Sequence, residues 1–343
     1  MLKTINMQER MDHYQVAGLS VAHIHNRHIN LESYGLLEAG STICVDDNTL
    51  FNTCSISKFL TGMLVVILAE KGLVDVDEDV NERLTSWKVP TNNWTEVKPV
   101  SLRNLLSHQS GIIDPEGSFS PLNVAGDIPS MVQLLEGKTP YCNEPIEVKY
   151  EPESEFHYSD AGFCIIEQLL EDVTGKSFAE LMQEYVFKPL EMRNSTYEMN
   201  GSEINSEMVS TGHNKKGEVV EGSYPVYPYP AASGLWSTSS DLAKVVVELM
   251  NALHGESKLG LSARAAKEMI SAQAGKEWCG LGVFLNGSEN EVEMSSLGWG
   301  IGFQCMLVAR PYTGHGLVVM TNTDLGVHQL KGIIGEVYQA YSS

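Results

Sequence analysis

The chain has 343 residues, 43% of them hydrophobic, which is enough to bury a large core in one big domain or in two lobes. Its 23 basic and 44 acidic residues give a net charge of −21, so its surface repels nucleic acid and anionic membranes. No apolar run reaches the roughly 18 residues of a membrane span, and the N-terminus MLKTINMQERMDHYQ lacks the apolar centre of a signal peptide. As written, the sequence predicts a cytoplasmic protein, or an exported one if a leader has been removed.

The cysteines are scattered along the chain, and none belongs to a Cys-x-x-Cys pair. In a chain of this length, scattered single cysteines are typical of reduced core residues rather than of a disulfide framework. They are Cys44, Cys54, Cys142, Cys164, Cys279 and Cys305.

Residues 17–36 predict a first hairpin, two strands joined by an Asn-Arg turn. His23, His25 and His28 form a His-x-His-x-x-His pattern that suggests a metal site. On a strand, however, only the first two share a face, and no acidic partner stands at ligand spacing. We therefore expect an exposed hairpin tip and no metal.

Ser55 and Lys58 open a long apolar run that ends at Gly72. On a helix these two residues share a face, and the amine would take the hydroxyl proton if burial and neighbours lowered its pKa. A helix N-terminus also offers backbone N–H groups to an oxyanion. The run is apolar nearly all round, which predicts a helix buried between layers. Ser-x-x-Lys alone is a common pattern, so the rest of the chain decides its meaning.

The middle of the chain predicts mainly helices. Residues 101–111 indicate a short capped helix, in which His108 is either a catalytic base or, as we expect, a packed and hydrogen-bonded histidine. Residues 112–150 lack periodicity and suggest a long loop at an active-site wall. Tyr158 then lies on the loop before a helix that ends at Gly175. Two more helices are expected near 177–190 and from Ser239 or Ser240, with a crossing back to the sheet at 223–238.

The C-terminal third predicts strands at 278–285, 291–296, 303–309 and 316–321. A closing helix over 327–341 is expected to bury Val327, Leu330, Ile334, Val337 and Tyr341.

Strands at both ends of the chain imply an α/β (α+β) fold with an antiparallel sheet built from the two termini and flanked by helices. We expect one catalytic domain over 1–343. Its sheet lobe would comprise about 1–60 and 225–343, with a mainly helical lobe over about 61–224 inserted.

With these elements placed, the sequence resembles the serine β-lactamase and penicillin-binding protein superfamily, on the class C side. The resemblance covers nearly the whole chain, and its strength is the order of many weak motifs. These are Leu50-Phe51, Ser55-x-x-Lys58, Leu105-Leu106-Ser107-His108-Gln109-Ser110-Gly111, Tyr158-Ser159-Asp160, Val173-Thr174-Gly175, Lys188-Pro189-Leu190-Glu191-Met192, Ser233-Gly234-Leu235-Trp236-Ser237-Thr238, Asp241, Gly302-Phe303 and Val319-Met320-Thr321-Asn322.

The resemblance implies that Ser55 is the acylated nucleophile, Lys58 its proton partner and Tyr158 a second proton-transfer group. The acyl oxyanion would lie between the backbone N–H of Ser55 and that of Trp299 on a sheet strand. Ser296-Leu297-Gly298 then matches the family's Lys-Thr-Gly or His-x-Gly tripeptide. The alternative is that Gly298-Trp299-Gly300 is only a strand bend.

Two departures from the family pattern concern the chemistry. Asp160 replaces the Asn of Tyr-x-Asn; a carboxylate only accepts hydrogen bonds, and beside Lys58 it would raise the lysine pKa. Proton transfer would then rest more on Tyr158, or Asp160 would face a substrate N–H or ammonium. Ser296 stands where the family has a cation that helps to hold a substrate carboxylate, so turnover of β-lactams should be poor.

The sequence therefore predicts a serine hydrolase of the β-lactamase and D-alanyl-D-alanine carboxypeptidase type, acting on a small-molecule or peptide amide or ester through an acyl-enzyme on Ser55. One alternative is a family VIII-type carboxylesterase on the same fold. The other is a protein that binds penicillin or wall peptide without turnover, suggested by Asp160 and Ser296. Serine acyl transfer requires neither a metal nor an organic cofactor, and we expect no nucleic-acid partner and no membrane span. The oligomeric state is left open.

Overall fold

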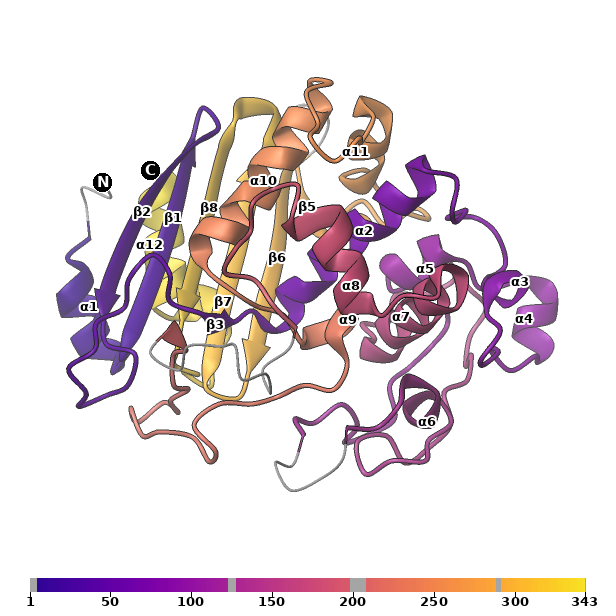
Figure 1. Ribbon diagram of the computed structural model, residues 1–343, viewed down its shortest axis with the longest axis horizontal. Helices are drawn as coiled ribbons and strands as arrows, with labels where there is room; N and C mark the ends of the chain where they lie inside the picture. The colour runs from indigo at the N-terminus through magenta and orange to yellow at the C-terminus, as the bar shows by residue number, and fades with distance from the viewer. Residues whose placement is uncertain (1–4, 123–127, 198–207, 288–290, 343) are drawn as a thin grey trace.

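The structure is a computed structural model that describes residues 5–122, 128–197, 208–287 and 291–342. Its centre is a six-stranded antiparallel sheet in the order β2-β1-β8-β7-β6-β5 (Figure 1). The strands are β1 (Gly18–His25), β2 (His28–Gly35), β5 (Phe284–Asn286), β6 (Glu293–Gly300), β7 (Phe303–Arg310) and β8 (His315–Thr321). A separate two-stranded ribbon pairs β3 (Phe51–Asn52) with β4 (Trp236–Ser237).

The two ends of the chain meet in the middle of this sheet, which confirms the predicted fold class. β1 pairs with β8 in the register that places Leu19 opposite Thr321 and Ile24 opposite Gly316. The first hairpin is also confirmed, because its turn residues Asn26 and Arg27 both adopt the positive φ that a two-residue hairpin turn requires.

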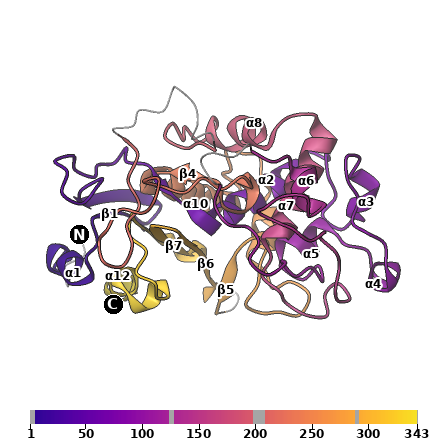
Figure 2. The same cartoon turned by 90° about the horizontal axis from the view of Figure 1, so that it is seen from below.

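Helices cover both faces of the sheet, as Figure 2 shows. α2 (Ser57–Glu70) and α10 (Ser239–Leu253) lie on one face, whereas α1 (Met7–Tyr14) and α12 (Ile333–Ser342) lie on the other. The alternation of β8 matches this arrangement: Val318 and Met320 join the large core around α2, and Leu317 and Val319 join a smaller core with α12.

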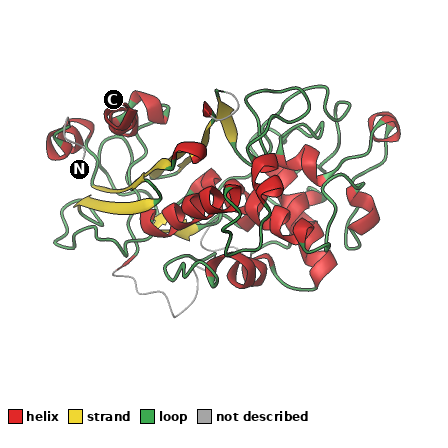
Figure 3. Ribbon diagram, turned by 90° about the horizontal axis from the view of Figure 1, so that it is seen from above, coloured by secondary structure: helices red, strands yellow, loops and turns green. Residues whose placement is uncertain are grey.

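The remaining helices gather at one end of the molecule, away from the chain termini (Figure 3). They surround α2, which is buried from Ser57 to Leu68, as its all-round apolar pattern predicted. These helices are α3 (Val80–Arg83), α4 (Asn93–Val97), α5 (Leu102–Leu106), α6 (Met131–Leu135), α7 (Asp160–Thr174), α8 (Phe178–Met182), the π-helical turn η2 (Gln183–Phe187) and α9 (Pro230–Ser233). α11 (Ala263–Met269) packs against α2 and α10.

Capping residues explain where α7 and α10 begin and where α7 ends. Ser159 caps α7 by accepting the Gly162 N–H, and Gly175 ends the helix in the left-handed conformation. Thr238 caps α10 by accepting the Asp241 N–H. Both starts agree with the sequence-based expectation.

Two predicted elements were wrong in extent. Of the predicted strand 278–285, only residues 284 and 285 lie in a strand, β5, which continues to Asn286. The earlier residues do not, because Gly280 closes a turn onto Val283 and Gly282 has φ +75°. The next strand, predicted at 291–296, begins at Glu293 and continues to Gly300.

The predicted closing helix over 327–341 is interrupted. A 3₁₀ turn, η6 (Gln329–Lys331), is followed by an extended Gly332, and the α-helix begins only at Ile333. This break changes the helical phase, so Val327 and Leu330 are exposed at 41% and 47%, whereas Ile334 and Val337 are buried as expected. The predicted loop 112–150 also contains α6, and residues 123–127 within it lie outside the described part.

The cysteine expectation is confirmed, since all six are free, and five of them are buried. Within the described ranges, no helix has both the length and the apolar character to cross a bilayer.

Candidate active site

Ser55 lies in a tight turn at the junction of the sheet with α2. The turn is a single 3₁₀ unit, η1 (Cys54–Ile56), so the α-helix begins at Ser57 rather than at Ser55. Cys54 adopts φ +49°, and its N–H is held by the Asn52 side chain at 2.8 Å. The Thr53 N–H binds the Leu235 carbonyl at 2.9 Å. The two residues before Ser55 are therefore held by hydrogen bonds, which fixes the turn that carries the hydroxyl.

Lys58 points from the first turn of α2 back to Ser55 and is only 3% exposed. Its Nζ donates to Ser55 Oγ at 3.3 Å, to Asp160 Oδ1 at 2.5 Å and to the Ala232 carbonyl at 2.9 Å. An ammonium has three N–H donors. Each donor of Lys58 therefore has a partner inside the protein.

The charge of Lys58 depends on Asp160. Burial alone would lower the lysine pKa, but the Asp160 carboxylate, supported by Tyr158, outweighs burial and raises the pKa above its ordinary value of 10.5. Lys58 is therefore an ammonium at neutral pH, which agrees with the expectation drawn from the Asp that replaces Asn.

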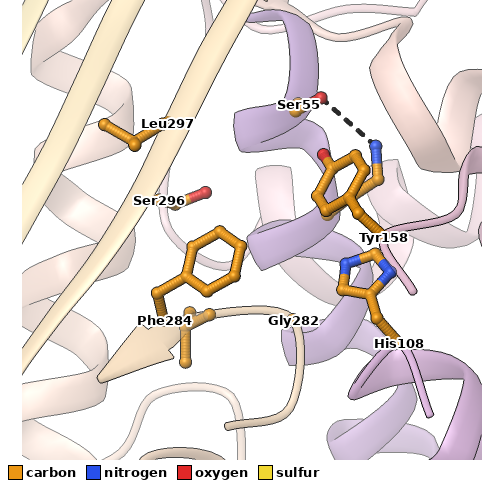
Figure 4. A pocket seen from close by; sticks show the side chains of 9 residues that line it. Ser55, His108, Tyr158, Gly282, Phe284, Ser296 and Leu297 are labelled. Carbon is orange, nitrogen blue, oxygen red and sulfur yellow. Dashed lines mark hydrogen bonds between the residues drawn. The ribbon is translucent and has the colours of Figure 1, made fainter. Parts of the chain in front are cut away.

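Tyr158 directs its hydroxyl at Ser55, as Figure 4 shows, and its ring centroid lies 4.9 Å from Lys58 Nζ. Burial raises the pKa of the phenol, Lys58 opposes this shift, and Asp160 adds to it. The phenol is thus neutral at physiological pH. Although 42% of the residue is exposed, the hydroxyl end faces the pocket.

His108 supports Tyr158 from behind rather than facing Ser55 as a base. The two rings stack with centroids 4.4 Å apart, and His108 Nδ1 accepts the Ser159 N–H at 3.1 Å. Burial, together with Lys58, lowers the pKa of His108 to about 3, so its imidazole is neutral. The predicted packed, hydrogen-bonded histidine is confirmed.

Asp114, which no sequence pattern indicated, holds the Tyr158–Asp160 loop through its carboxylate. It accepts hydrogen bonds from Ser159 Oγ at 2.6 Å and from the N–H groups of Asp160 at 2.7 Å and Ala161 at 3.1 Å. Burial and the nearby Asp160 raise its pKa. In the sequence Asp114 is a single carboxylate in the predicted loop 112–150, and nothing near it indicates that it contacts the start of α7.

Glu167 was also missed, and it positions Lys58 through α9. It is buried, and burial raises its pKa well above the ordinary value. Its Oε2 accepts the Ala231 N–H at 2.8 Å. The next residue, Ala232, supplies the carbonyl that accepts from Lys58.

Strand β6 forms the opposite wall of the site. Ser296 is 4% exposed and faces the pocket (Figure 4), whereas the Trp299 side chain lies on the other face of the sheet and donates to Asp324 at 2.8 Å. A Cβ on Gly298 would collide with the Thr53 carbonyl oxygen, so only glycine allows β6 to approach the Ser55 turn this closely.

The far edge of β6 is open beside Ser55, because β5 pairs only with residues 293–295 of this strand. Backbone groups further along β6 that point away from β7 are therefore available to a ligand.

One pocket collects most of the predicted site residues. It includes Ser55, Lys58, Tyr158 and Ser296 but neither Gly298 nor Trp299, and Asp160 contacts it through Lys58. The lining residues are Ser55, Lys58, His108, Tyr158, Gly282, Val283, Phe284, Ser296 and Leu297.

Among the described residues, no group of three or more His, Cys, Asp or Glu side chains could hold a metal ion. In the hairpin, His23 packs edge-on against Tyr341 and His25 packs against His315.

Comparisons with known proteins agree with this architecture. Protein flp of Staphylococcus aureus strain MRSA252 is 23% identical over 325 residues, which cover 90% of this chain and 60% of that protein. The chain thus spans about 60% of the length of this curated relative.

Among solved structures, the D-alanine carboxypeptidase AmpC from Burkholderia cenocepacia has a TM-score of 0.74 at 18% identity, covering 98% of this chain and 95% of that one. A penicillin-binding protein from Bacillus halodurans has a TM-score of 0.73 at 18% identity, covering 99% of both chains. These likenesses show the fold. The family model described as Beta-lactamase matches residues 6–333, and the chain therefore belongs to the Beta-lactamase family.

Proposed function

We propose that the protein is a serine acyl hydrolase that cleaves an amide or ester through an acyl-enzyme on Ser55. The observation that carries this proposal is the contact of Lys58 Nζ with Ser55 Oγ at 3.3 Å, beside a tyrosine hydroxyl that faces the same serine. A nucleophile within hydrogen-bond reach of a charged partner, with a second proton-transfer group, is the arrangement that such catalysis needs.

The charge of Lys58 determines the direction of proton transfer. Because Lys58 is an ammonium and donates to Ser55 Oγ, the serine proton is free to pass to the Tyr158 oxygen. A neutral phenol that accepts this proton gives its own to the leaving group, so no net charge forms on the tyrosine. Ser55 Oγ forms the bond to the acyl carbon, and the protonated amine or alcohol departs.

Deacylation follows the same route in reverse. Water attacks the acyl carbon and gives its proton to Tyr158, which returns a proton to Ser55 Oγ. In both steps the negative charge on the acyl oxygen would be held by the backbone N–H of Ser55 and by the Trp299 N–H on the open edge of β6.

The name of the Burkholderia relative suggests that the substrate is an amide at the end of a D-amino-acid peptide. One observation favours an ester instead: Lys58 is the only cation that lines the pocket in the described part of the chain, and Asp160 neutralises it. A member that binds penicillin or peptide without turnover would keep the same fold. We place hydrolysis first because Ser55, Lys58 and Tyr158 converge on one pocket.

The test is hydrolysis of p-nitrophenyl esters and of a penicillin by the purified protein and by Ser55→Ala. We expect Ser55→Ala to lose turnover completely, because the acyl carbon then has no nucleophile, while exposed Ser154→Ala retains full activity. Equal urea unfolding of the three proteins would exclude misfolding as the cause. Unchanged turnover in Ser55→Ala would refute the proposal.

A further inference from the structure

We propose that the site takes an uncharged ester or amide that carries a flat apolar group, and rejects substrates with a carboxylate near the scissile bond. This inference rests on the proposed function. Its two parts come from two features of the pocket, namely the charges around Lys58 and an aromatic strip that begins at Tyr158 and ends beside β6.

The first observation is that the pocket offers no cation to an anionic substrate. Lys58 is the only cation among the described lining residues, since His108 is neutral, and its three donors are already used by Ser55, Asp160 and Ala232. A carboxylate entering the pocket would therefore lose its hydration without gaining a charged partner. It would also approach Asp160, whose side chain is 22% exposed.

The second observation concerns Ser296, on the opposite wall. The residue is only 4% exposed and its side chain faces the pocket in Figure 4, yet its hydroxyl has no hydrogen-bond partner among the described residues. A hydroxyl donates one hydrogen bond and accepts others. It therefore suits a neutral carbonyl or ether oxygen of a substrate, and it cannot balance a full negative charge.

The third observation is a continuous strip of aromatic rings, which we call the aromatic strip: Tyr158, His108, Phe156, Trp278 and Phe284. After the Tyr158–His108 stack comes Phe156, whose ring centroid lies 5.6 Å from that of His108. Trp278 follows, with its ring centroid 4.4 Å from that of Phe156. Phe284 stacks on Trp278 at 6.4 Å with an interplanar angle of 21°.

The aromatic strip passes behind Tyr158 through buried His108, and its outer rings, Phe284 and Trp278, are partly exposed. Phe284 lines the pocket, opposite Ser295 on β6, and Trp278 is 43% exposed at the outer end. Gly282 fixes the approach, since its positive φ lets the loop before Phe284 pack against the Lys58 carbonyl. Partly exposed stacked rings leave apolar faces that a flat apolar group covers favourably.

The test compares three p-nitrophenyl esters: the butyrate, the hemisuccinate and the phenylacetate. The first two have acyl chains of equal length and differ by a terminal carboxylate. We expect kcat/KM for the hemisuccinate to be at least about tenfold below that for the butyrate, and kcat/KM for the phenylacetate to be roughly fivefold above it. Equal values for hemisuccinate and butyrate would overturn the inference, while leaving the proposed acyl-enzyme standing.

Three substitutions test which residues set each preference. Phe284→Ala, and separately Trp278→Ala at the exposed end, should remove the advantage of the phenylacetate while keeping that of butyrate over hemisuccinate. Ser296→Lys should raise relative hemisuccinate turnover at least fivefold, because it adds a free cation. Unchanged ratios in all three variants would contradict the assignment.

Binding supplies a readout that does not depend on turnover. On Ser55→Ala, ligand-observed NMR should detect methyl phenylacetate but not the phenylacetate anion at equal concentration, and Trp278→Ala in the same chain should weaken the ester signal. Equal binding of the ester and the anion would overturn the inference, whether or not any ester is hydrolysed. A failure to hydrolyse any of the p-nitrophenyl esters would instead refute the proposed function.

Discussion

The two walls of the pocket differ in how completely their polar groups are paired. Around Lys58 every donor has a partner. Asp114 binds the Asp160 N–H, Glu167 binds the N–H next to Ala232, and His108 stacks on Tyr158. Along β6, Ser296 has no hydrogen-bond partner among the described residues, and the strand edge beside Ser55 is open. A fully paired wall is suited to hold reacting groups rigidly, whereas an open wall is suited to receive a substrate. We infer that the paired side holds the reacting groups, whereas the open side along β6 receives the substrate.

The largest effect should come from Lys58→Ala. We expect kcat/KM to fall about a thousandfold, because Ser55 loses its charged partner. The protein should also be less stable to urea, because Asp160 keeps its carboxylate without a counter-charge.

The double variant Lys58→Ala/Asp160→Asn separates these two effects. It removes the unpaired carboxylate, so we expect it to recover stability to urea without recovering activity. If activity returned as well, the paired wall would not be the catalytic one.

A smaller effect is expected from Asp160→Asn, which removes the charge that keeps Lys58 protonated. Because Asp160 raises the Lys58 pKa against burial, its loss lowers that pKa, and the alkaline limb of the kcat/KM profile should move to lower pH. Asp324→Asn, which removes a carboxylate on the other face of the sheet, is the matched control and should leave the profile in place. Identical profiles for Asp160→Asn and the native protein would mean that Asp160 does not control the charge of Lys58.

The smallest effect concerns stability rather than rate. The pKa of His108 is about 3 in the folded protein and 6.5 in the unfolded chain, so the unfolded chain takes up a proton first as the pH falls. The stability that His108 contributes is therefore complete above pH 6.5 and is lost as the pH falls towards 3.

His108→Gln removes this titration. The loss of unfolding free energy between pH 6.5 and pH 4, measured by urea titration, should be smaller in the variant than in the native protein. An equal loss would show that His108 is not buried as a neutral ring.

Sequence patterns predicted the parts of this molecule that depend on local periodicity. The buried helix behind Ser55, the helix after Tyr158 and the sheet formed from both termini each follow from apolar spacing and helix caps within the segment itself. The exposure of Val327 and Leu330 was missed because one extended glycine, Gly332, changes the helical phase.

The support of the site was not predictable from the sequence. Asp114 reaches the loop at Asp160 from 46 residues away, and Glu167 acts on Lys58 through Ala231 and its neighbour. Such contacts depend on tertiary packing and leave no short motif. The roles of Tyr158 and of the Lys58–Asp160 pair were therefore expected from the resemblance. The residues that hold them in place could be identified only from the fold.

The central claim is that Ser55 carries the acyl group, and mass spectrometry of the protein and of its peptides tests it most directly. The protein is mixed with p-nitrophenyl phenylacetate and, separately, with a penicillin, quenched in acid and digested to locate any adduct. We predict a phenylacetyl adduct on the peptide that contains Ser55, absent from Ser55→Ala, with little or no penicilloyl adduct. An adduct on another residue, or ester turnover that persists in Ser55→Ala, would contradict the account.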